Sequence, residues 1–571
     1  MREPPAGDQG DAGAFLAEVP LFATLEPEAL AELSRATEAV AVTGGAWLFR
    51  QGDADDGLYV VRSGRIEVVA EQPTPTTVRV LGPGDALGEL AVFRAGRRSA
   101  GARALRDSEL LHITRARFSH LIDECPGFGA ALLKLLADKV ADAGPVPRGP
   151  APRRVLSVVA PPGRGAAAAD LARALAVSLR RFGSSAALRA ADAGGDPVTW
   201  GRAVDRCEAE VDWVVLWDDE ADDPAVAVPG SWRGFCFRQA DRVVFLTDPD
   251  APAPGHVPSA PAVIHLAVVS GRGRPLPPPW AATALSPHAH HVVDAALDGP
   301  SVDRLARRLA GRSVGLVLSG GGARGFAHIG VLERLHDAGV AIDRVGGVSI
   351  GAFIGALVAQ GLDAGRLEDV CRTELVDRRP FADYTIPRNS IIRGLRGERL
   401  FQRLFGDDHF EEQPRSMFCV SADLVSARAV VHRSGPIAPA VTASMSIPGY
   451  APPRLTPEGL LVDGGILNNL PVDEMAAQEE GPVIAVDVMQ RPPGRGNREG
   501  VVQRLPGIME TLARSTVLAS WGHSQVNRTL ADLVISPEVG PVGLMEWRAI
   551  NQAIDAGRRA ADAALADGWG G

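Results

Sequence analysis

The chain has 571 residues, of which 46% are hydrophobic and 22% charged, and this composition excludes a wholly disordered protein. Its formal net charge of −10 at pH 7 argues against a general nucleic-acid-binding protein, which would need a basic face. At ~150 residues per domain, this length predicts roughly four domains or three larger ones.

The cysteines and the N-terminus favour a cytoplasmic protein. Five widely spaced cysteines include no CxxC pair, which disfavours a disulfide framework and a zinc site and favours reduced thiols. The N-terminus is polar, without the apolar core of a secretory signal. The uncharged stretch Val345–Leu362 approaches the length of a membrane span, but its five glycines favour a buried strand–turn–helix.

Residues 14–142 predict a β-rich domain that closes with a helical run, because glycine-containing turn signals separate short apolar strands. Within it, Gly88 and Glu89 are followed nine residues later by Arg98 and Ser99. An arginine fork can hold a cyclic phosphate through two hydrogen bonds, and a nearby carboxylate can accept one from a ribose hydroxyl.

This segment resembles the cyclic nucleotide-binding domain, which is a β jelly roll. The resemblance implies that Glu89 binds the ribose 2′-hydroxyl of cAMP or cGMP and that Arg98 binds the phosphate, with Gly88 and Ser99 beside them. The alternative is a jelly roll that keeps this shape without binding nucleotide.

A Pro-rich linker over residues 143–154 predicts an extended connection to the next domain. Residues 155–300 alternate apolar strands with helices and predict a Rossmann-like α/β spacer domain. The expected elements are strands over 155–160, 211–217, 242–247 and 262–269 and a helix over 166–179. The turn after the first strand stands where a P-loop would, but Ala166 and Ala167 replace its Lys and Ser/Thr, so we do not expect ATP hydrolysis.

Residues 301–571 form the largest predicted unit, again with alternating strands and helices. The strand Val314–Leu318 runs into three consecutive glycines, Gly320–Gly322. Successive backbone N–H groups at a helix N-terminus form a nest that binds a phosphate or a developing oxyanion. Taken alone, the glycines are explained equally well by a tight strand–helix turn.

One strand later, the sequence GVSIG places Ser349 between Gly347 and Gly351 in a G-x-S-x-G motif. An apolar strand leads in and an apolar helix leads out, as a nucleophile elbow requires. Acyl transfer needs a nucleophile and an oxyanion hole together, so the glycine nest one strand earlier strengthens the assignment.

Two residues compete for the role of catalytic base. Asp463 ends an apolar strand and precedes two glycines, so its carboxylate can approach the serine directly, although Asp-Gly turns are common. His523 would complete the order Ser349, Asp463, His523 that α/β-hydrolase triads use, but its polar neighbours are typical of a surface histidine.

The runs GGGARG, GVSIG and DGG resemble the motifs of patatin-like phospholipases. The longer stretches ASMSIPGYAPP (443–453) and LLVDGGILNNLP (460–471) are similar to the catalytic domain of the neuropathy target esterase group. The resemblance implies a Ser349–Asp463 dyad without a catalytic histidine. It further implies an oxyanion hole formed by Gly320, Gly321, Gly322, Arg324 and Gly325.

The sequence therefore predicts a multidomain serine hydrolase with a β jelly roll, an α/β spacer and a patatin-like catalytic domain. By the resemblance, its substrates are phospholipids or lysophospholipids at a membrane surface, and a cyclic nucleotide is a possible effector. We expect no metal, no required cofactor and no nucleic-acid partner, and leave the oligomeric state open. Two alternatives stay open: a triad carboxylesterase that uses His523 on non-lipid esters, and a nucleotide-responsive regulator that acts by contact.

Overall fold

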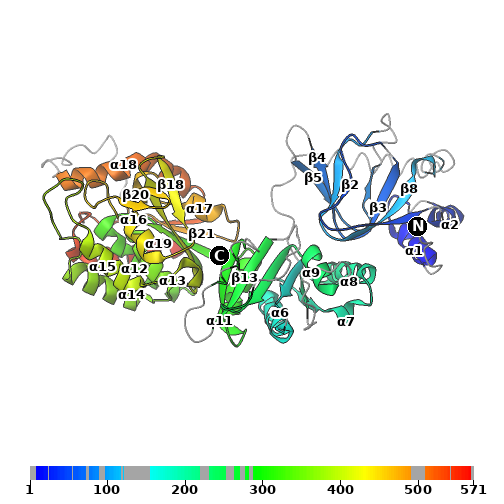
Figure 1. Ribbon diagram of the computed structural model, residues 1–571, viewed down its shortest axis with the longest axis horizontal. Coiled ribbons are helices and arrows are strands. Elements are labelled where there is room, and N and C mark those ends of the chain that lie inside the picture. Colours follow the sequence, from blue (N-terminus) through cyan, green and yellow to red (C-terminus); the bar gives the residue numbers. More distant parts are fainter. Residues whose placement is uncertain are drawn as a thin grey trace. The chain divides into compact units, whose positions relative to one another are not determined.

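The computed structural model describes residues 8–566 except 23–24, 36, 55, 72–75, 89–96, 118–119, 121–154, 162, 219–230, 253–262, 271–276, 279, 282–286, 490–507 and 541. The chain forms two compact units (Figure 1). The first comprises residues up to 266 with 279–289, and the second comprises 267–278 with 290 onward.

The first unit begins with a β jelly roll, as the sequence predicts. Two short helices lead into it, α1 (Asp8–Glu18) and α2 (Pro27–Arg35). Its strands are β1 (Glu38–Val42), β2 (Trp47–Phe49), β3 (Gly57–Ser63), β4 (Ile66–Ala70), β5 (Thr76–Leu81), β6 (Ala86–Leu87), β7 (Gly101–Ala104) and β8 (Ser108–Thr114). They form two four-stranded sheets in the orders β1-β8-β3-β6 and β2-β7-β4-β5, with apolar side chains packed between them. Most of the predicted closing helix lies outside the described residues.

A parallel α/β layer follows the jelly roll. Its elements are β9 (Val155–Val159), α6 (Gly165–Leu179), β10 (Ser185–Leu188), α7 (Ala190–Ala193), α8 (Pro197–Glu210), β11 (Trp213–Trp217), α9 (Trp232–Gln239), β12 (Arg242–Thr247), β13 (Val263–Ser270) and β14 (Ala289–Asp294). The six-stranded sheet has the order β10-β11-β9-β12-β13-β14, and the division between the two units falls within β13. The four strands and the helix predicted here are confirmed to within two residues.

Within the first unit, ion pairs join the β7–β8 turn of the jelly roll to the α/β layer. The buried Arg106 guanidinium donates to Glu208 of α8 at 2.8 Å and to Asp241, just before β12, at 2.7 Å. Arg238 at the end of α9 binds the neighbouring Asp107 through one nitrogen, at 2.9 Å from each carboxylate oxygen. Removing one partner of a buried ion pair leaves an uncompensated buried charge, which destabilises the fold. These ion pairs therefore favour one particular contact between the jelly roll and the α/β layer.

The second unit is built on a mixed sheet in the order β19-β20-β17-β16-β15-β21-β22, with β18 paired to β17. Its strands are β15 (Val314–Leu318), β16 (Ile342–Val348), β17 (Ser416–Asp423), β18 (Arg428–His432), β19 (Arg454–Thr456), β20 (Gly459–Asp463), β21 (Val483–Val486) and β22 (Leu533–Ile535). Five neighbouring strands of this sheet are parallel to one another: β17, β16, β15, β21 and β22. The strands β18 and β20 are antiparallel to β17.

Helices cover both faces of this sheet and bury its apolar strands. They are α11 (Gly299–Leu309), α12 (Ala327–Asp337), α13 (Ile350–Ala359), α14 (Ala364–Cys371), α15 (Leu395–Phe405), α16 (Ile437–Ser444), α17 (Val472–Ala476), α18 (Ile508–Arg528) and α19 (Ile550–Ala566). The uncharged stretch Val345–Leu362 is the predicted strand–turn–helix, formed by β16 and α13. Among the helices of the described residues, none combines the length and apolar character needed to cross a membrane.

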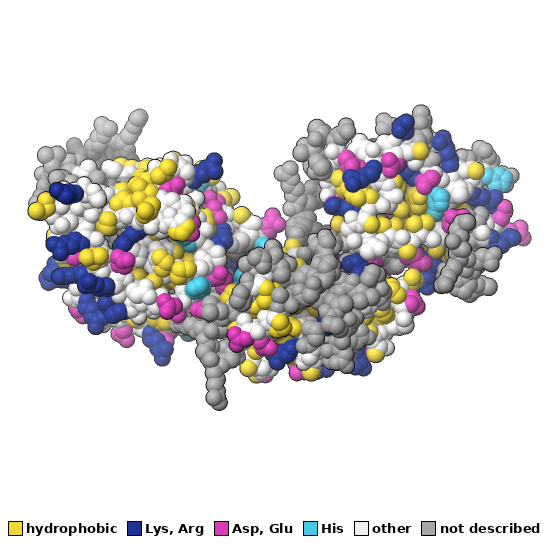
Figure 2. Space-filling view, viewed as in Figure 1, with side chains coloured by type: hydrophobic (Ala, Val, Ile, Leu, Met, Phe, Trp, Pro, Cys, Tyr) yellow, Lys and Arg dark blue, Asp and Glu magenta, His cyan; other side chains and the backbone are white. Residues whose placement is uncertain are grey.

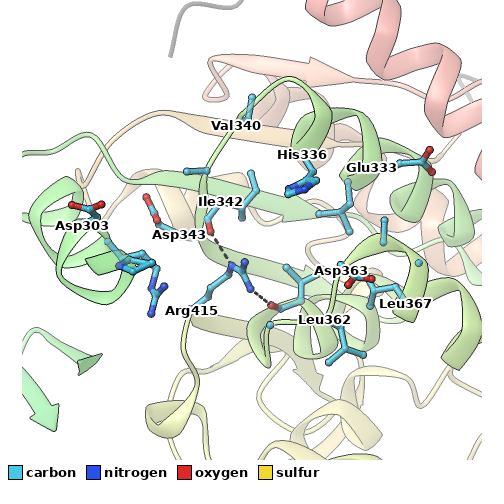
Figure 3. A pocket seen from close by; sticks show the side chains of 18 of the residues that line it. Asp303, Glu333, His336, Val340, Ile342, Asp343, Leu362, Asp363, Leu367 and Arg415 are labelled. Atoms are coloured by element: carbon cyan, nitrogen blue, oxygen red, sulfur yellow. Dashed lines mark hydrogen bonds between the residues drawn. The ribbon is translucent and has the colours of Figure 1, made fainter. Parts of the chain in front are cut away.

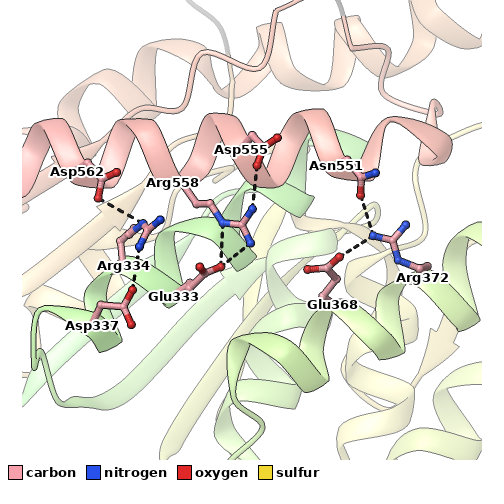
Figure 4. Close-up of polar contacts among 9 residues, drawn as sticks. All are labelled: Glu333, Arg334, Asp337, Glu368, Arg372, Asn551, Asp555, Arg558 and Asp562. Carbon is pink, nitrogen blue, oxygen red and sulfur yellow. Dashed lines mark hydrogen bonds and ion pairs between the residues drawn. The ribbon is translucent and has the colours of Figure 1, made fainter.

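The C-terminal helix α19 packs directly on α12. A Cβ on Gly330 would collide with the carbonyl oxygen of Ile554, and one on Gly557 would collide with that of Ala327, so the two backbones touch at these glycines. Ion pairs flank the contact, with Arg558 of α19 bound to Glu333 of α12 at 2.7 Å (Figure 4). Close backbone approach at small residues fixes the crossing of the two helices.

Candidate active site

Ser349 stands at the sharp turn between β16 and α13. Its backbone is left-handed, with φ +56°, which is rare for a residue with a side chain and costs on the order of 1–3 kcal/mol. A Cβ on Gly347 would collide with the carbonyl of Gly351, and a Cβ on Gly351 would collide with that of Leu318. The motif's two glycines are therefore required by backbone packing, and the local geometry is that of a nucleophile elbow.

Asp463 reaches this serine from the end of β20. Strands β16 and β20 pair with successive stretches of β17, because Val348 faces Val420 while Asp463 faces Ser421. The carboxyl ends of β16 and β20 therefore meet, and the Ser349 hydroxyl lies close enough to the Asp463 carboxylate to lower the pKa of that carboxylate.

Asp463 is fully enclosed. Burial raises its pKa to about 6, against the lowering effects of the hydrogen bonds from Ser349 and from the Gly465 N–H. The Gly465 N–H donates to Oδ1 at 2.8 Å. Within the described part of the chain, no cation lies at ion-pair distance from this carboxylate. The result is an isolated buried carboxylate whose pKa is poised for proton transfer near neutral pH.

The glycine nest lies against the serine. A Cβ on Gly320 would be only 3.2 Å from the Ser349 Cβ. The Gly320 N–H donates to the backbone oxygen of Asn469 at 3.3 Å, whereas the N–H groups of Gly321 and Gly322 have no acceptor among the described residues. These two amides are the donors available to an oxyanion formed at Ser349.

Arg324 and Gly325 make contacts that hold the loop after the nest in place. The Arg324 Nε donates to the backbone oxygen of Val542 at 2.8 Å, so this side chain holds the C-terminal segment. A Cβ on Gly325 would collide with the Ile350 side chain. Both residues thus fix the position of the loop, and their predicted part in an oxyanion hole stays a prediction.

His523 lies elsewhere. It is exposed on α18, and its Nε2 lies 3.2 Å from an oxygen of Asp473 on α17. In the described residues it has no contact with Ser349 or Asp463. This placement offers no support for the triad alternative.

Two supporting residues were missed by the sequence analysis. The Ser444 hydroxyl, at the end of α16, accepts from the Ser349 N–H at 3.0 Å and donates to the Val420 oxygen at 2.7 Å. The Asn469 amide donates to the Gly320 oxygen at 3.3 Å, which ties the nest to the loop after Asp463. Ser444 lies in the motif run 443–453 and Asn469 in the run 460–471. Their place in these runs was the only feature of the sequence that could have indicated their supporting role.

The predicted nucleotide site is partly described. Gly88 has φ +94°, and a Cβ there would collide with the Arg98 guanidinium, so these two residues are adjacent. Arg98 is buried, forms an ion pair with Asp56 and lies 4.1 Å from the centre of the Phe49 ring. Ser99 is exposed beside it, and Glu89 lies outside the described residues. The Asp56 carboxylate thus binds the Arg98 guanidinium, which is the group that would bind a cyclic phosphate.

Two family models match the chain. Residues 316–476 match the patatin-like phospholipase model, and residues 39–125 match the cyclic nucleotide-binding domain model. The first range contains Ser349 and Asp463, and the second contains Arg98 and Gly88. Both matches agree with the fold of the unit in which they lie.

Several curated proteins are similar to the chain. An uncharacterised NTE family protein of Mycobacterium tuberculosis is 36% identical over 97% of this chain and 96% of its own length. Lysophospholipase nte1 of Aspergillus niger is 29% identical over 81% of this chain and 36% of its own length. Patatin-like phospholipase domain-containing protein 6 of Mus musculus is 29% identical over 80% and 38%.

Solved structures resemble the jelly roll. The sensor domain of the transcriptional regulator DNR from Pseudomonas aeruginosa is 23% identical over 24% of this chain and 92% of that chain, with a TM-score of 0.23. The regulatory domain of Toxoplasma gondii PKA with cAMP is 28% identical over 21% and 46%, with a TM-score of 0.20.

Proposed function

The chain belongs to the NTE family and carries a patatin-like phospholipase domain, and on this premise we propose that Ser349 and Asp463 act as a catalytic dyad on fatty-acyl esters of phospholipids or lysophospholipids. The observation that carries the proposal is the meeting of two strand ends, which places the Ser349 hydroxyl beside the buried Asp463 carboxylate and next to two backbone N–H groups without an acceptor in the described chain. The shorter match to fungal lysophospholipases supports the lipid substrate.

The dyad acts in two half-reactions. Asp463 takes the Ser349 proton as the hydroxyl oxygen attacks the ester carbonyl, and the N–H groups of Gly321 and Gly322 hold the oxyanion. When the tetrahedral intermediate collapses, Asp463 returns the proton to the leaving alcohol. Water then attacks the acyl-enzyme with Asp463 again as base, releasing the fatty acid and restoring Ser349.

Substrate is proposed to arrive from a membrane surface, because the unit that contains Ser349 and Asp463 also carries a basic and apolar patch. This arginine patch consists of exposed side chains that form no ion pair among the described residues: Arg379, Arg388, Arg393, Arg396 and Arg399. Figure 2 shows basic side chains gathered in the region of α15. Tyr384, Ile386 and Leu395 add apolar surface, with Ile386 86% exposed. Such a combination suits an anionic lipid surface.

The patch is connected to the dyad through the segment before β19. The Tyr450 hydroxyl donates to the Phe381 oxygen at 2.6 Å, at the start of the patch. A few residues earlier, the Ser446 oxygen accepts from the Asp463 N–H at 2.8 Å. The segment 446–450 is thus hydrogen-bonded both to the start of the patch and to Asp463.

The jelly roll is proposed to bind a cyclic nucleotide, cAMP or cGMP, and to change the rate of hydrolysis. Support comes from the match to the cyclic nucleotide-binding domain and from the contact of Arg98 with Gly88. The phosphate would replace Asp56 on the Arg98 guanidinium, since an arginine fork binds either anion.

Fatty-acid release tests the proposal. The full chain and Ser349→Ala are incubated with vesicles of lysophosphatidylcholine, with vesicles of phosphatidylcholine and with a water-soluble short-chain ester. We expect release from a lipid substrate by the parent and a loss of at least ~10³-fold in the variant. Hydrolysis of the soluble ester alone would favour a non-lipid carboxylesterase, and activity that survives in the variant would exclude Ser349 as nucleophile.

A further inference from the structure

A cavity lies at the amino end of strand β16, whereas Ser349 lies at the carboxyl end of the same strand. It has a volume of about 680 Å³, within the range of small-molecule sites, and lies among α11, the start of β16 and the loop between α13 and α14 (Figure 3). Ile342 at the first position of β16 lines it, whereas Ser349 follows the last position of that strand. At ~3.3 Å per residue, the two are about 20 Å apart.

The cavity has apolar walls. Six aliphatic side chains line it, from α12, β16, α13, α14 and the loops between them: Leu332, Val340, Ile342, Val358, Leu362 and Leu367. Val340, Ile342 and Leu362 are only half-buried, so part of this apolar surface faces the open cavity. Exposing such a concave apolar surface to water is unfavourable, and an apolar ligand chain would cover it.

Two arginines of the cavity form no ion pair within the part of the chain that the structure describes. Arg304 of α11 has no hydrogen bond or ion pair among the described residues, and Arg415 donates only to the backbone oxygens of Ile342, at 3.0 Å, and Val358, at 2.8 Å. The two guanidinium groups repel each other, and burial and this repulsion lower the pKa of Arg415. An anion between them would relieve the repulsion.

Against the lowering by burial, the charge of Asp343 acts to raise the pKa of both Arg304 and Arg415, but neither arginine forms an ion pair with this carboxylate among the described residues. Asp343 is held by Arg307 through two bonds of 2.7 and 2.8 Å, and Glu333 is held by Arg558 at 2.7 Å. Asp363 accepts from the Arg366 N–H as the cap of α14. Asp303 interacts with the cation of Arg307.

We propose that this cavity binds one long-chain fatty acid, with its carboxylate between Arg304 and Arg415 and its acyl chain along the aliphatic walls. The apolar walls disfavour a small hydrophilic anion, and the paired guanidinium groups disfavour a neutral lipid. The choice of a fatty acid rests on the proposed function, because ester hydrolysis releases this product beside a membrane. The site is distinct from the catalytic one, so the product would bind without occupying the dyad.

Equilibrium dialysis with radiolabelled oleate, below its micelle-forming concentration, tests the proposal. The full chain carries Ser349→Ala throughout, so that turnover plays no part. Relative to this parent, we expect Arg304→Gln and, independently, the cavity-filling Ala364→Phe to weaken oleate binding at least tenfold. Arg312→Gln removes the same charge from an exposed position just after α11, outside the cavity, and should leave binding unchanged. Thermal unfolding shows that each variant is folded.

Competing ligands define the headgroup. Oleyl alcohol, which lacks the charge, should displace oleate poorly, and acetate, which lacks the chain, should not displace it. Displacement by oleoyl lysophosphatidate at a lower concentration than by oleate itself would overturn the carboxylate assignment.

The proposal also fails if Arg304→Gln and Ala364→Phe bind oleate as the parent does. This outcome is separate from failure of the proposed function: a chain that hydrolyses no ester can still show the cavity-dependent binding, and an active enzyme can lack it.

Discussion

Asp463 combines two opposing demands at the scale of one residue. In the proposed dyad its carboxylate must be ionised to accept the Ser349 proton, yet its complete burial favours the neutral form and raises its pKa to about 6. The hydrogen bonds from Ser349 and Gly465 only partly offset this effect. A base of this pKa is largely ionised at pH 7 while remaining basic enough to take a proton.

The pH dependence follows from this pKa. Since the proposed base works when ionised, kcat/KM on lysophosphatidylcholine should rise with pH and level off above about 6. A pH–rate profile between pH 4.5 and 8 measures the acid limb. Full activity at pH 4.5 would contradict the assignment of Asp463 as base.

The raised pKa of Asp463 should also make the stability of the protein depend on pH, in the direction opposite to activity: stability should fall as pH rises. The folded-state pKa of about 6 lies above the ordinary aspartate value of 3.8, so the stability contribution of Asp463 is fully present below pH ~4 and is lost as pH rises through 6. Asp463→Asn removes a penalty of about 3 kcal/mol at pH 8. Its Tm should therefore exceed that of the parent at pH 8, and the difference should disappear near pH 4. Equal Tm values at pH 8 would contradict the buried, ionised carboxylate.

Sequence reasoning at this scale found the residues that carry a motif and missed those that support them. Ser349 and Asp463 could be predicted because the glycines around them are required by the backbone. Ser444 and Asn469 could not be singled out, because their hydrogen bonds to Ser349 and Gly320 join residues about 95 and 149 positions apart in the chain. Only the pairing of distant strands brings these groups together.

At the scale of elements, the glycine nest of the patatin-like unit is held by a segment that lies beyond the range matched by the family model. The family model ends at residue 476, but the Leu544 oxygen accepts from the Ala323 N–H at 2.8 Å, directly beside the glycine nest. The helix α19 that follows this contact packs on α12, which begins just after the nest. The C-terminal segment therefore positions the proposed oxyanion hole. Amphipathic patterning predicts such helices but not their partners.

The α12–α19 crossing gives a direct prediction. Gly557→Ala places a Cβ against the Ala327 carbonyl, so the helices must separate, at a cost of ~1–3 kcal/mol. Thermal unfolding should show a Tm several degrees below that of the parent. In Gly522→Ala on α18, where nothing lies within 4 Å of the added Cβ, helix propensity should instead add ~0.5–1 kcal/mol of stability. A Gly557→Ala protein that unfolds no earlier than the parent would contradict the close packing.

The arginine patch gives a second prediction at this scale. Replacing Arg388, Arg393 and Arg396 together with Gln should weaken binding to vesicles that contain anionic phosphatidylglycerol by roughly 100-fold at low salt, since each basic residue contributes ~1 kcal/mol. Vesicle sedimentation measures this binding. Turnover of a soluble ester should be unaffected.

A matched triple variant distinguishes the patch from net charge. It removes three exposed arginines of the same unit that form no ion pair within the described part of the chain: Arg312, Arg366 and Arg559. This variant should bind vesicles as the parent does. Equal weakening in both triple variants would mean that overall charge, and not the patch, governs membrane binding.

At the scale of the whole molecule, a jelly roll and a patatin-like unit share one chain. The fold of each could be predicted, because turn signals, apolar strands and glycine motifs are local features. The ion pairs of Arg106 with Glu208 and Asp241 could not, since they join residues more than 100 positions apart. These buried contacts give the jelly roll a specific attachment to the α/β layer, and we propose that a change at the proposed nucleotide site acts through it.

Cyclic nucleotide should therefore change hydrolysis in the full chain. We expect saturating cAMP or cGMP to alter fatty-acid release at least twofold, and Arg98→Gln to abolish both binding and response. The neighbouring Arg97→Gln should retain them, because Arg97 is exposed and donates only to the Gly52 oxygen at 2.8 Å. Bound nucleotide without any change in activity would refute the regulatory role, and no binding of either nucleotide would refute the sensor itself.

The most direct test of the account compares two candidate bases in one assay. Fatty-acid release from lysophosphatidylcholine vesicles is measured for the parent, Asp463→Asn and His523→Ala, each shown to be folded by its thermal unfolding. The dyad predicts a loss of at least ~10³-fold in Asp463→Asn and near-parent activity in His523→Ala. A folded His523→Ala protein that is as inactive as Asp463→Asn would contradict the dyad and restore the triad.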